Sequence, residues 1–186
     1  MLGPIAKDDD LVDRSDTVRA HLLRCLLERF SSAFPAIDFS VMWESDHLNA
    51  QAILTDGRRG VVVLGGLARH SALSENGLAV AIAHEVGHHL GGRPFDRDFP
   101  WLSVEGQADY WATRVGMKRV YPREEVLARS LQGAGELVDL YRGFYRPWRG
   151  ARGRVVTPRR VLSPKSRWLT FRAGALGNRR PRCACA

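Results

Sequence analysis

The 186-residue sequence lacks a long uninterrupted apolar stretch. A helix that crosses a bilayer needs about 20 consecutive apolar residues, so we expect no membrane span. The first ten residues, MLGPIAKDDD, also lack a basic region followed by an apolar one, and no secretory signal is visible. We therefore expect a cytoplasmic protein if the chain is complete, and a periplasmic or secreted one if a leader has been removed.

Cysteine is scarce, with three residues in the whole chain. Cys183 and Cys185 are too close together in the sequence for a disulfide bond between them to cross-link distant parts of the fold. Cys25 lies in a helical pattern that suits a small buried apolar side chain. The sequence therefore excludes a disulfide framework, and nothing in it requires an oxidising compartment.

Acidic residues are missing from the last quarter of the chain. From Leu140 to Ala186 there are 13 Lys and Arg and no Asp or Glu, whereas the residues up to Asp139 carry 15 basic and 20 acidic side chains. We expect a folded domain over residues 1–146 and a basic, poorly ordered tail over residues 147–186. The tail could bind nucleic acid or another polyanion, because arginine neutralises phosphates, or it could have no specific partner.

The spacing of apolar residues predicts one helix, three strands and three further helices. Their expected ranges are 13–33 for the first helix, 37–43, 50–54 and 61–64 for the strands, and 75–90, 104–120 and 124–145 for the later helices. The segment Thr55-Asp56-Gly57-Arg58 indicates a hairpin between the last two strands. This order predicts an α+β fold with helices packed on one face of a small, mostly antiparallel three-stranded sheet.

The segment His84-Glu85-Val86-Gly87-His88 lies on the helix expected over residues 75–90. Two histidines four positions apart are separated by about 40° around a helix axis, so both imidazoles point to one side. Two such nitrogens can reach one zinc ion, and Glu85, turned by about 100° from His84, lies beside the ion and can take a proton from its bound water. The alternative is two incidental histidines on a buried helix.

A third ligand must come from elsewhere, and the chain has no histidine after His89. Glu105 and Asp109 lie four positions apart on the next expected helix, so their carboxylates share one face. Glu105 can complete a His₂Glu zinc site with an open fourth position, and Asp109 can hydrogen-bond the far nitrogen of a ligand histidine. The alternative is a solvated acidic face.

The motif HEVGHH, followed 17 residues after His88 by VEGQADYWA, resembles the gluzincin metallopeptidases, and most nearly their small M48-like members. The resemblance covers about residues 11–145. It implies a minimal gluzincin-like fold in which His84, His88 and Glu105 bind one zinc ion, Glu85 is the general base and acid, and Asp109 orients a ligand. It also implies that Asn49 and Ala50 lie on an edge strand that aligns an extended substrate.

The sequence therefore predicts a zinc-dependent endopeptidase acting on a peptide or protein substrate. Many relatives have a His or Tyr that stabilises the oxyanion, and none can be chosen here; the candidates are Tyr110, Tyr121, Tyr141, Tyr145 and Arg142. This gap leaves a second hypothesis, a zinc-stabilised binding or regulatory protein whose arginine-rich tail contacts nucleic acid or another polyanion.

Overall fold

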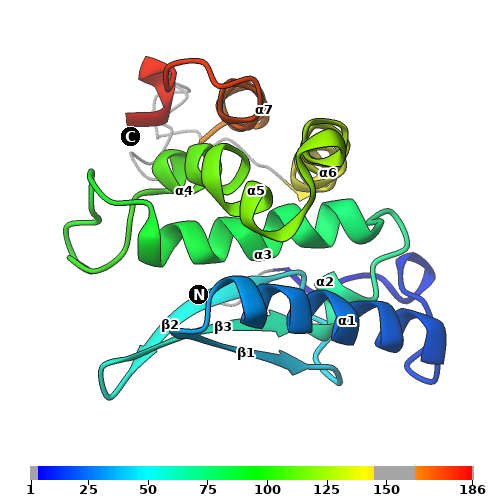
Figure 1. Ribbon diagram of the computed structural model, residues 1–186. Coiled ribbons are helices and arrows are strands. Elements are labelled where there is room, and N and C mark those ends of the chain that lie inside the picture. Colours follow the sequence, from blue (N-terminus) through cyan, green and yellow to red (C-terminus); the bar gives the residue numbers. More distant parts are fainter. Residues whose placement is uncertain (1–3, 145–161, 186) are drawn as a thin grey trace, which may run out of the picture.

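The computed structural model describes residues 4–144 and 162–185 and places the helices above a small sheet (Figure 1). The sheet and α1 form the lower layer, α3 crosses the middle, and α4 to α7 lie above it. The elements in chain order are η1 (Asp8–Asp10), α1 (Thr17–Ala33), β1 (Ile37–Met42), β2 (Ala50–Thr55), β3 (Arg58–Leu64), α2 (Gly65–Ala68), α3 (Glu75–Leu90), α4 (Glu105–Trp111), the π-helical turn η2 (Ala112–Gly116), α5 (Met117–Val120), α6 (Arg123–Phe144), α7 (Pro164–Ala175) and η3 (Arg182–Cys185). The predicted α+β class is confirmed.

The sheet is mixed, which corrects the expectation of mostly antiparallel pairing. The strand order is β1-β3-β2, with β3 antiparallel to β2 and parallel to β1. The loop after β1 reverses the chain, so β1 and β2 run in opposite directions. Because β3 inserts between them, it must be parallel to one of the two.

The turn between β2 and β3 explains the hairpin register. Asp56 and Gly57 both have positive φ, at 51° and 77°, as a two-residue type I′ turn requires. Thr55 is consequently paired with Arg58, and Ala52 with Val61. This register leaves β2 as an edge strand beside α3.

Helix α3 is the centre of the hydrophobic core. Ser74 caps its first turn by accepting a hydrogen bond from the Asn76 backbone N–H, as its sequence predicts. The side chains of Leu78, Ile82 and Val86 are completely buried.

Among the described residues, no helix combines the length and the apolar character that crossing a membrane requires.

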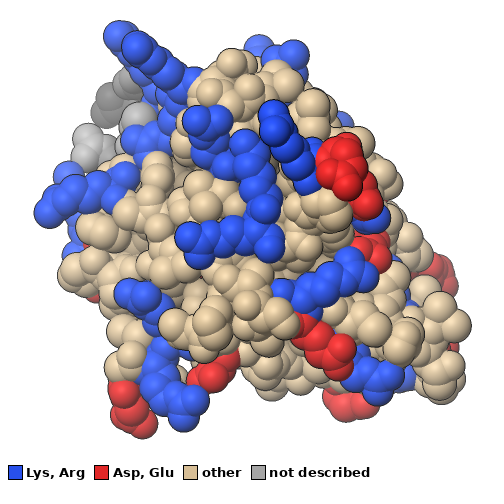
Figure 2. All heavy atoms as spheres, viewed as in Figure 1, with Lys and Arg blue, Asp and Glu red and all other residues tan. Residues whose placement is uncertain are grey.

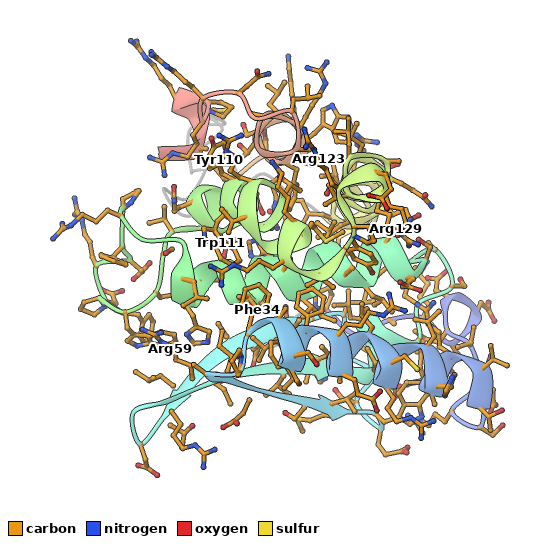
Figure 3. The ribbon with its side chains drawn as sticks, viewed as in Figure 1. Phe34, Arg59, Tyr110, Trp111, Arg123 and Arg129 are labelled. Carbon is orange, nitrogen blue, oxygen red and sulfur yellow. The ribbon has the colours of Figure 1, made fainter. Side chains whose placement is uncertain are left out.

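Helix α4 packs closely on α3 because a glycine lies at the contact. A Cβ atom added at Gly87 would lie 2.8 Å from the Ala108 carbonyl oxygen, so a larger residue would push the two helices apart. The end of α4 also contacts the end of α1, where the rings of Phe34 and Trp111 lie 5.9 Å apart (Figure 3). The expected single helix over 104–120 is instead divided into α4, η2 and α5.

The C-terminal region differs from the poorly ordered tail that we expected. Residues 162–185 include α7 and η3, and α7 contacts both α4 and α6. Ser163 caps α7, Pro164 occupies its first turn, and Phe171 is completely buried. Thr113 of η2 donates a hydrogen bond to the Phe171 carbonyl oxygen at 2.7 Å. The rest of the expected tail, residues 147–161 and 186, lies outside the described part of the chain.

Candidate metal centre

The three predicted ligand residues converge. His84 and His88 come from α3, and Glu105 comes from the first turn of α4. The Nε2 atom of His84 lies 3.4 Å from Glu105 Oε2, and the Nε2 atom of His88 lies 3.6 Å from Glu105 Oε1. One ligand atom from each residue lies within 4.8 Å of the other two, so this cluster could hold a metal ion.

Each histidine nitrogen lies near one of the two Glu105 oxygens, at a distance that zinc coordination allows. Zinc binds histidine nitrogen and carboxylate oxygen at about 2.0–2.1 Å, which separates neighbouring ligand atoms by roughly 3.3 Å in a tetrahedron. The distances of 3.4 and 3.6 Å are close to that value. Two imidazoles and one carboxylate also form a donor set that suits zinc.

Both histidines are oriented by a partner on the nitrogen that faces away from the cluster. His84 Nδ1 lies 2.8 Å from Asp109 Oδ1, and His88 Nδ1 lies 2.7 Å from the Ser103 carbonyl oxygen. A hydrogen bond at Nδ1 leaves Nε2 free to bind a metal ion and fixes the direction of the ring. Asp109 therefore lies where the sequence predicts it.

The charges of the clustered side chains compensate one another. Burial would lower the pKa of His84, but hydrogen bonds to Asp109 and Glu105 outweigh this effect and raise the pKa to about 10. Burial would raise the pKa of Glu105, but the hydrogen bond to His84 and the neighbouring positive charges hold it well below its ordinary value. Histidine binds metal ions in its neutral form, so a metal ion held here would favour neutral His84.

Glu85 lies beside the three ligand residues. Its Oε1 atom is 3.9 Å from His84 Nε2, and its Oε2 atom accepts a hydrogen bond of 2.7 Å from the Ala52 backbone N–H. The side chain is 12% exposed. Burial raises the pKa of this carboxyl group above its ordinary value, which brings it closer to the range of a general base that works near neutral pH.

A cleft of about 680 Å³ opens over these residues. Its floor is made by His84, Glu85, His88 and Glu105. Apolar side chains from several elements also line it: Leu67 from α2, Leu137, Leu140 and Phe144 from α6, and Phe99, Trp101 and Leu102 from the loop before α4. The site therefore combines a few polar groups with apolar walls, as ligand sites usually do.

Asn49 and Ala50 line the same cleft. The Leu64 backbone N–H donates to the Asn49 carbonyl oxygen, so Asn49 bonds toward β3. Peptide groups alternate in direction along an antiparallel pair, which turns those of Ala50 and Ala52 toward the open edge of β2. The predicted part of Asn49 and Ala50 in substrate binding stays a prediction.

Arg167 is the site residue that the sequence did not indicate. It lies on α7, and its guanidinium group donates to both carboxylate oxygens of Asp109, at 2.6 and 3.0 Å. The same group lies 3.7 Å from Glu105 Oε2 and lines the cleft. The one available signal was the capping pattern Ser163-Pro164 before a run with buried apolar positions, which predicts a helix but not its partner.

The candidates for oxyanion stabilisation separate clearly. Among the described candidates, Tyr141 lines the cleft, under the guanidinium group of Arg167, whose central carbon is 5.2 Å from the ring centre. Its hydroxyl donates to the Leu162 carbonyl oxygen at 3.2 Å. The others are engaged elsewhere or lie outside the described residues: Tyr110 donates to the Asn178 carbonyl, Tyr121 donates to Glu75, Arg142 pairs with Asp139, and Tyr145 is not described.

Replacing Asp109 with asparagine should weaken zinc binding by about 10–100-fold, the usual effect of losing the partner of a ligand histidine. The neutral asparagine amide cannot replace the negative charge of the Asp109 carboxylate, which holds the His84 ring in place. The affinity would be measured by competition with a chromophoric chelator. The exposed Asp139→Asn variant is the matched control and should bind as the original protein does; equal affinity in both variants would remove the role given to Asp109.

The chain matches no family model, and neither a curated protein nor a solved structure matches it. The likeness to gluzincins therefore depends on the motifs and on the geometry of the cluster.

Proposed function

We propose that this protein is a zinc-dependent endopeptidase. The observation that carries the proposal is the position of the Glu85 carboxylate, next to three converging ligand groups and inside an open cleft. A cluster that served stability alone would need neither a free carboxylate beside it nor a path for a substrate.

Zinc, when bound here, would polarise the substrate carbonyl and lower the pKa of a bound water to about 7. Glu85 would accept a proton from the attacking water while the oxygen atom of that water bonds to the carbonyl carbon. The carbon–nitrogen bond then breaks, and Glu85 returns the proton to the leaving amine. The hydrogen bond from the Ala52 N–H holds the Glu85 carboxylate in place for both transfers.

The surrounding residues support an extended peptide as substrate. The outward peptide groups of Ala50 on the edge of β2 can pair with a substrate backbone, as in β-strand addition. Arg167 and Tyr141 also line the cleft, where they could donate to the oxygen that becomes negative during the attack. Asp109 keeps His84 in its ligand orientation throughout.

The accessibility of the cluster favours a catalytic site over a closed structural one. Structural zinc sites have four protein ligands, whereas catalytic sites have three and an open position. The described cluster contains three ligand residues, and the Glu105 side chain is 39% exposed toward the cleft.

A cleavage assay tests the proposal directly. The purified protein, loaded with one equivalent of zinc, should cleave an unfolded casein substrate and a quenched peptide library. Activity should disappear with 1,10-phenanthroline and return when zinc is added. A protein that binds zinc and stays folded but cleaves neither substrate would contradict the proposal and favour a zinc-stabilised binding protein.

A further inference from the structure

Two stretches of the chain are basic and free of acidic residues. The first, residues 110–123, contains Arg114, Lys118, Arg119 and Arg123 and no Asp or Glu. The second begins after Asp139 and continues to the C-terminus with 13 basic residues. They are separated by residues 124–139, which carry four acidic side chains and one basic one, so the sequence alone does not place them together.

The fold brings these two stretches side by side. The Tyr110 hydroxyl donates to the Asn178 carbonyl oxygen at 2.7 Å. A Cβ atom at Gly174 would lie 2.5 Å from the Tyr110 carbonyl oxygen, and one at Gly177 would lie 2.6 Å from the Arg114 guanidinium. The end of α7 and the segment after it therefore lie directly against the end of α4 and η2.

The resulting basic surface consists of Arg114, Lys118, Arg123, Arg172, Arg179 and Arg182, all of them exposed. Figure 2 shows Lys and Arg gathered over the upper half of this face, with acidic residues toward its right and lower edges. Within the described residues, no carboxylate forms an ion pair with any of the six. In contrast, the arginines on the other elements often do, as Arg29, Arg58 and Arg129 show.

This surface is separate from the cleft. Arg167 and Arg172 lie on the same helix, but Arg167 is drawn into the cleft by Asp109, whereas Arg172 is exposed. Occupation of the basic surface would therefore leave Arg167 in its pair with Asp109. An inference about this surface does not depend on the proposed peptidase activity.

We propose that the basic surface binds double-stranded nucleic acid through its phosphate backbone, without reading sequence. Five of its six members are arginines, whose planar guanidinium groups match phosphate oxygens in pairs. Single-stranded nucleic acid is bound largely through exposed aromatic side chains on which its bases stack. The exposed aromatic side chains Phe95 and Phe99 lie in the loop before α4, so the surface also lacks the aromatic anchors of a membrane-binding face.

The proposal is tested by fluorescence anisotropy of the full chain with a labelled 20-base-pair DNA duplex of arbitrary sequence. Binding should weaken steeply with salt, because each phosphate contact contributes about 0.9 to the slope of log affinity against log salt. The triple variant Arg114→Glu, Arg172→Glu and Arg179→Glu should bind at least about 10-fold more weakly and lose two to three units of that slope.

The matched control is the triple variant Arg24→Glu, Arg59→Glu and Arg97→Glu, which changes the net charge equally with exposed arginines on other elements. It should retain most of the affinity, and circular dichroism should show both variants folded. Equal losses in both variants, or unchanged binding in the first, would overturn the proposal. So would binding to vesicles containing phosphatidylserine with no binding to the duplex.

Discussion

The Glu85→Gln variant is expected to keep its zinc and to lose about 10²–10⁴-fold in the rate of peptide cleavage. Glutamine has the same shape, and its amide oxygen can still accept the hydrogen bond from the Ala52 N–H. It cannot accept a proton from water, and this transfer is what a general base contributes to the rate. The loss should therefore appear in kcat, with little change in zinc content.

The control for this variant is Glu124→Gln, an exposed residue in the first turn of α6. This variant loses one negative charge, as Glu85→Gln does, but at a position away from the cleft. It should cleave at the original rate. If Glu85→Gln retained full activity with bound zinc, Glu85 would not be the general base. If it lost zinc together with activity, the effect would be on binding and not on proton transfer.

The Arg167→Met variant is expected to lower the free energy of unfolding by about 3–5 kcal/mol, the usual cost of breaking a buried ion pair from one side. Asp109 is completely buried, and the guanidinium group of Arg167 contacts both of its carboxylate oxygens. Without Arg167 the carboxylate keeps one partner, His84. Urea unfolding of the metal-free protein measures the change.

A double-mutant cycle separates this pair from general packing effects. The Arg167→Met and Asp109→Asn double variant should be much closer to the original stability than Arg167→Met alone, because the buried carboxylate that loses its bonds to Arg167 is then absent. The exposed Arg172→Met variant, five residues along α7, should change the stability by less than about 0.5 kcal/mol. Additive effects of the two single changes would contradict the assigned pair.

The sequence predicted the parts of this site that depend on local spacing. Helical periodicity brings His84 and His88 to one side of α3, and the same rule places Glu105 and Asp109 together on α4. The Asp-Gly turn likewise predicted the hairpin that makes β2 an edge strand. In each case the determining residues lie within a few positions of one another.

Features that depend on distant contacts could not be predicted. Arg167 pairs with a carboxylate 58 positions earlier in the chain, and its helix lies in a segment whose composition favours a disordered tail. The choice of Tyr141 among the oxyanion candidates also requires knowing which side of α6 faces the cleft. The parallel pairing of β1 with β3 depends on which edge of the hairpin β1 joins, and strand spacing alone does not determine it.

The zinc content of the purified protein, prepared without chelators and measured by elemental mass spectrometry, tests the metal centre most directly. We expect about one zinc ion per chain, and a clear loss of zinc in the His88→Ala and Glu105→Ala variants, with the Glu124→Gln control unchanged. A folded protein that remains metal-free after incubation with zinc, or that keeps its zinc in both ligand variants, would contradict the metal centre and the chemistry proposed for it.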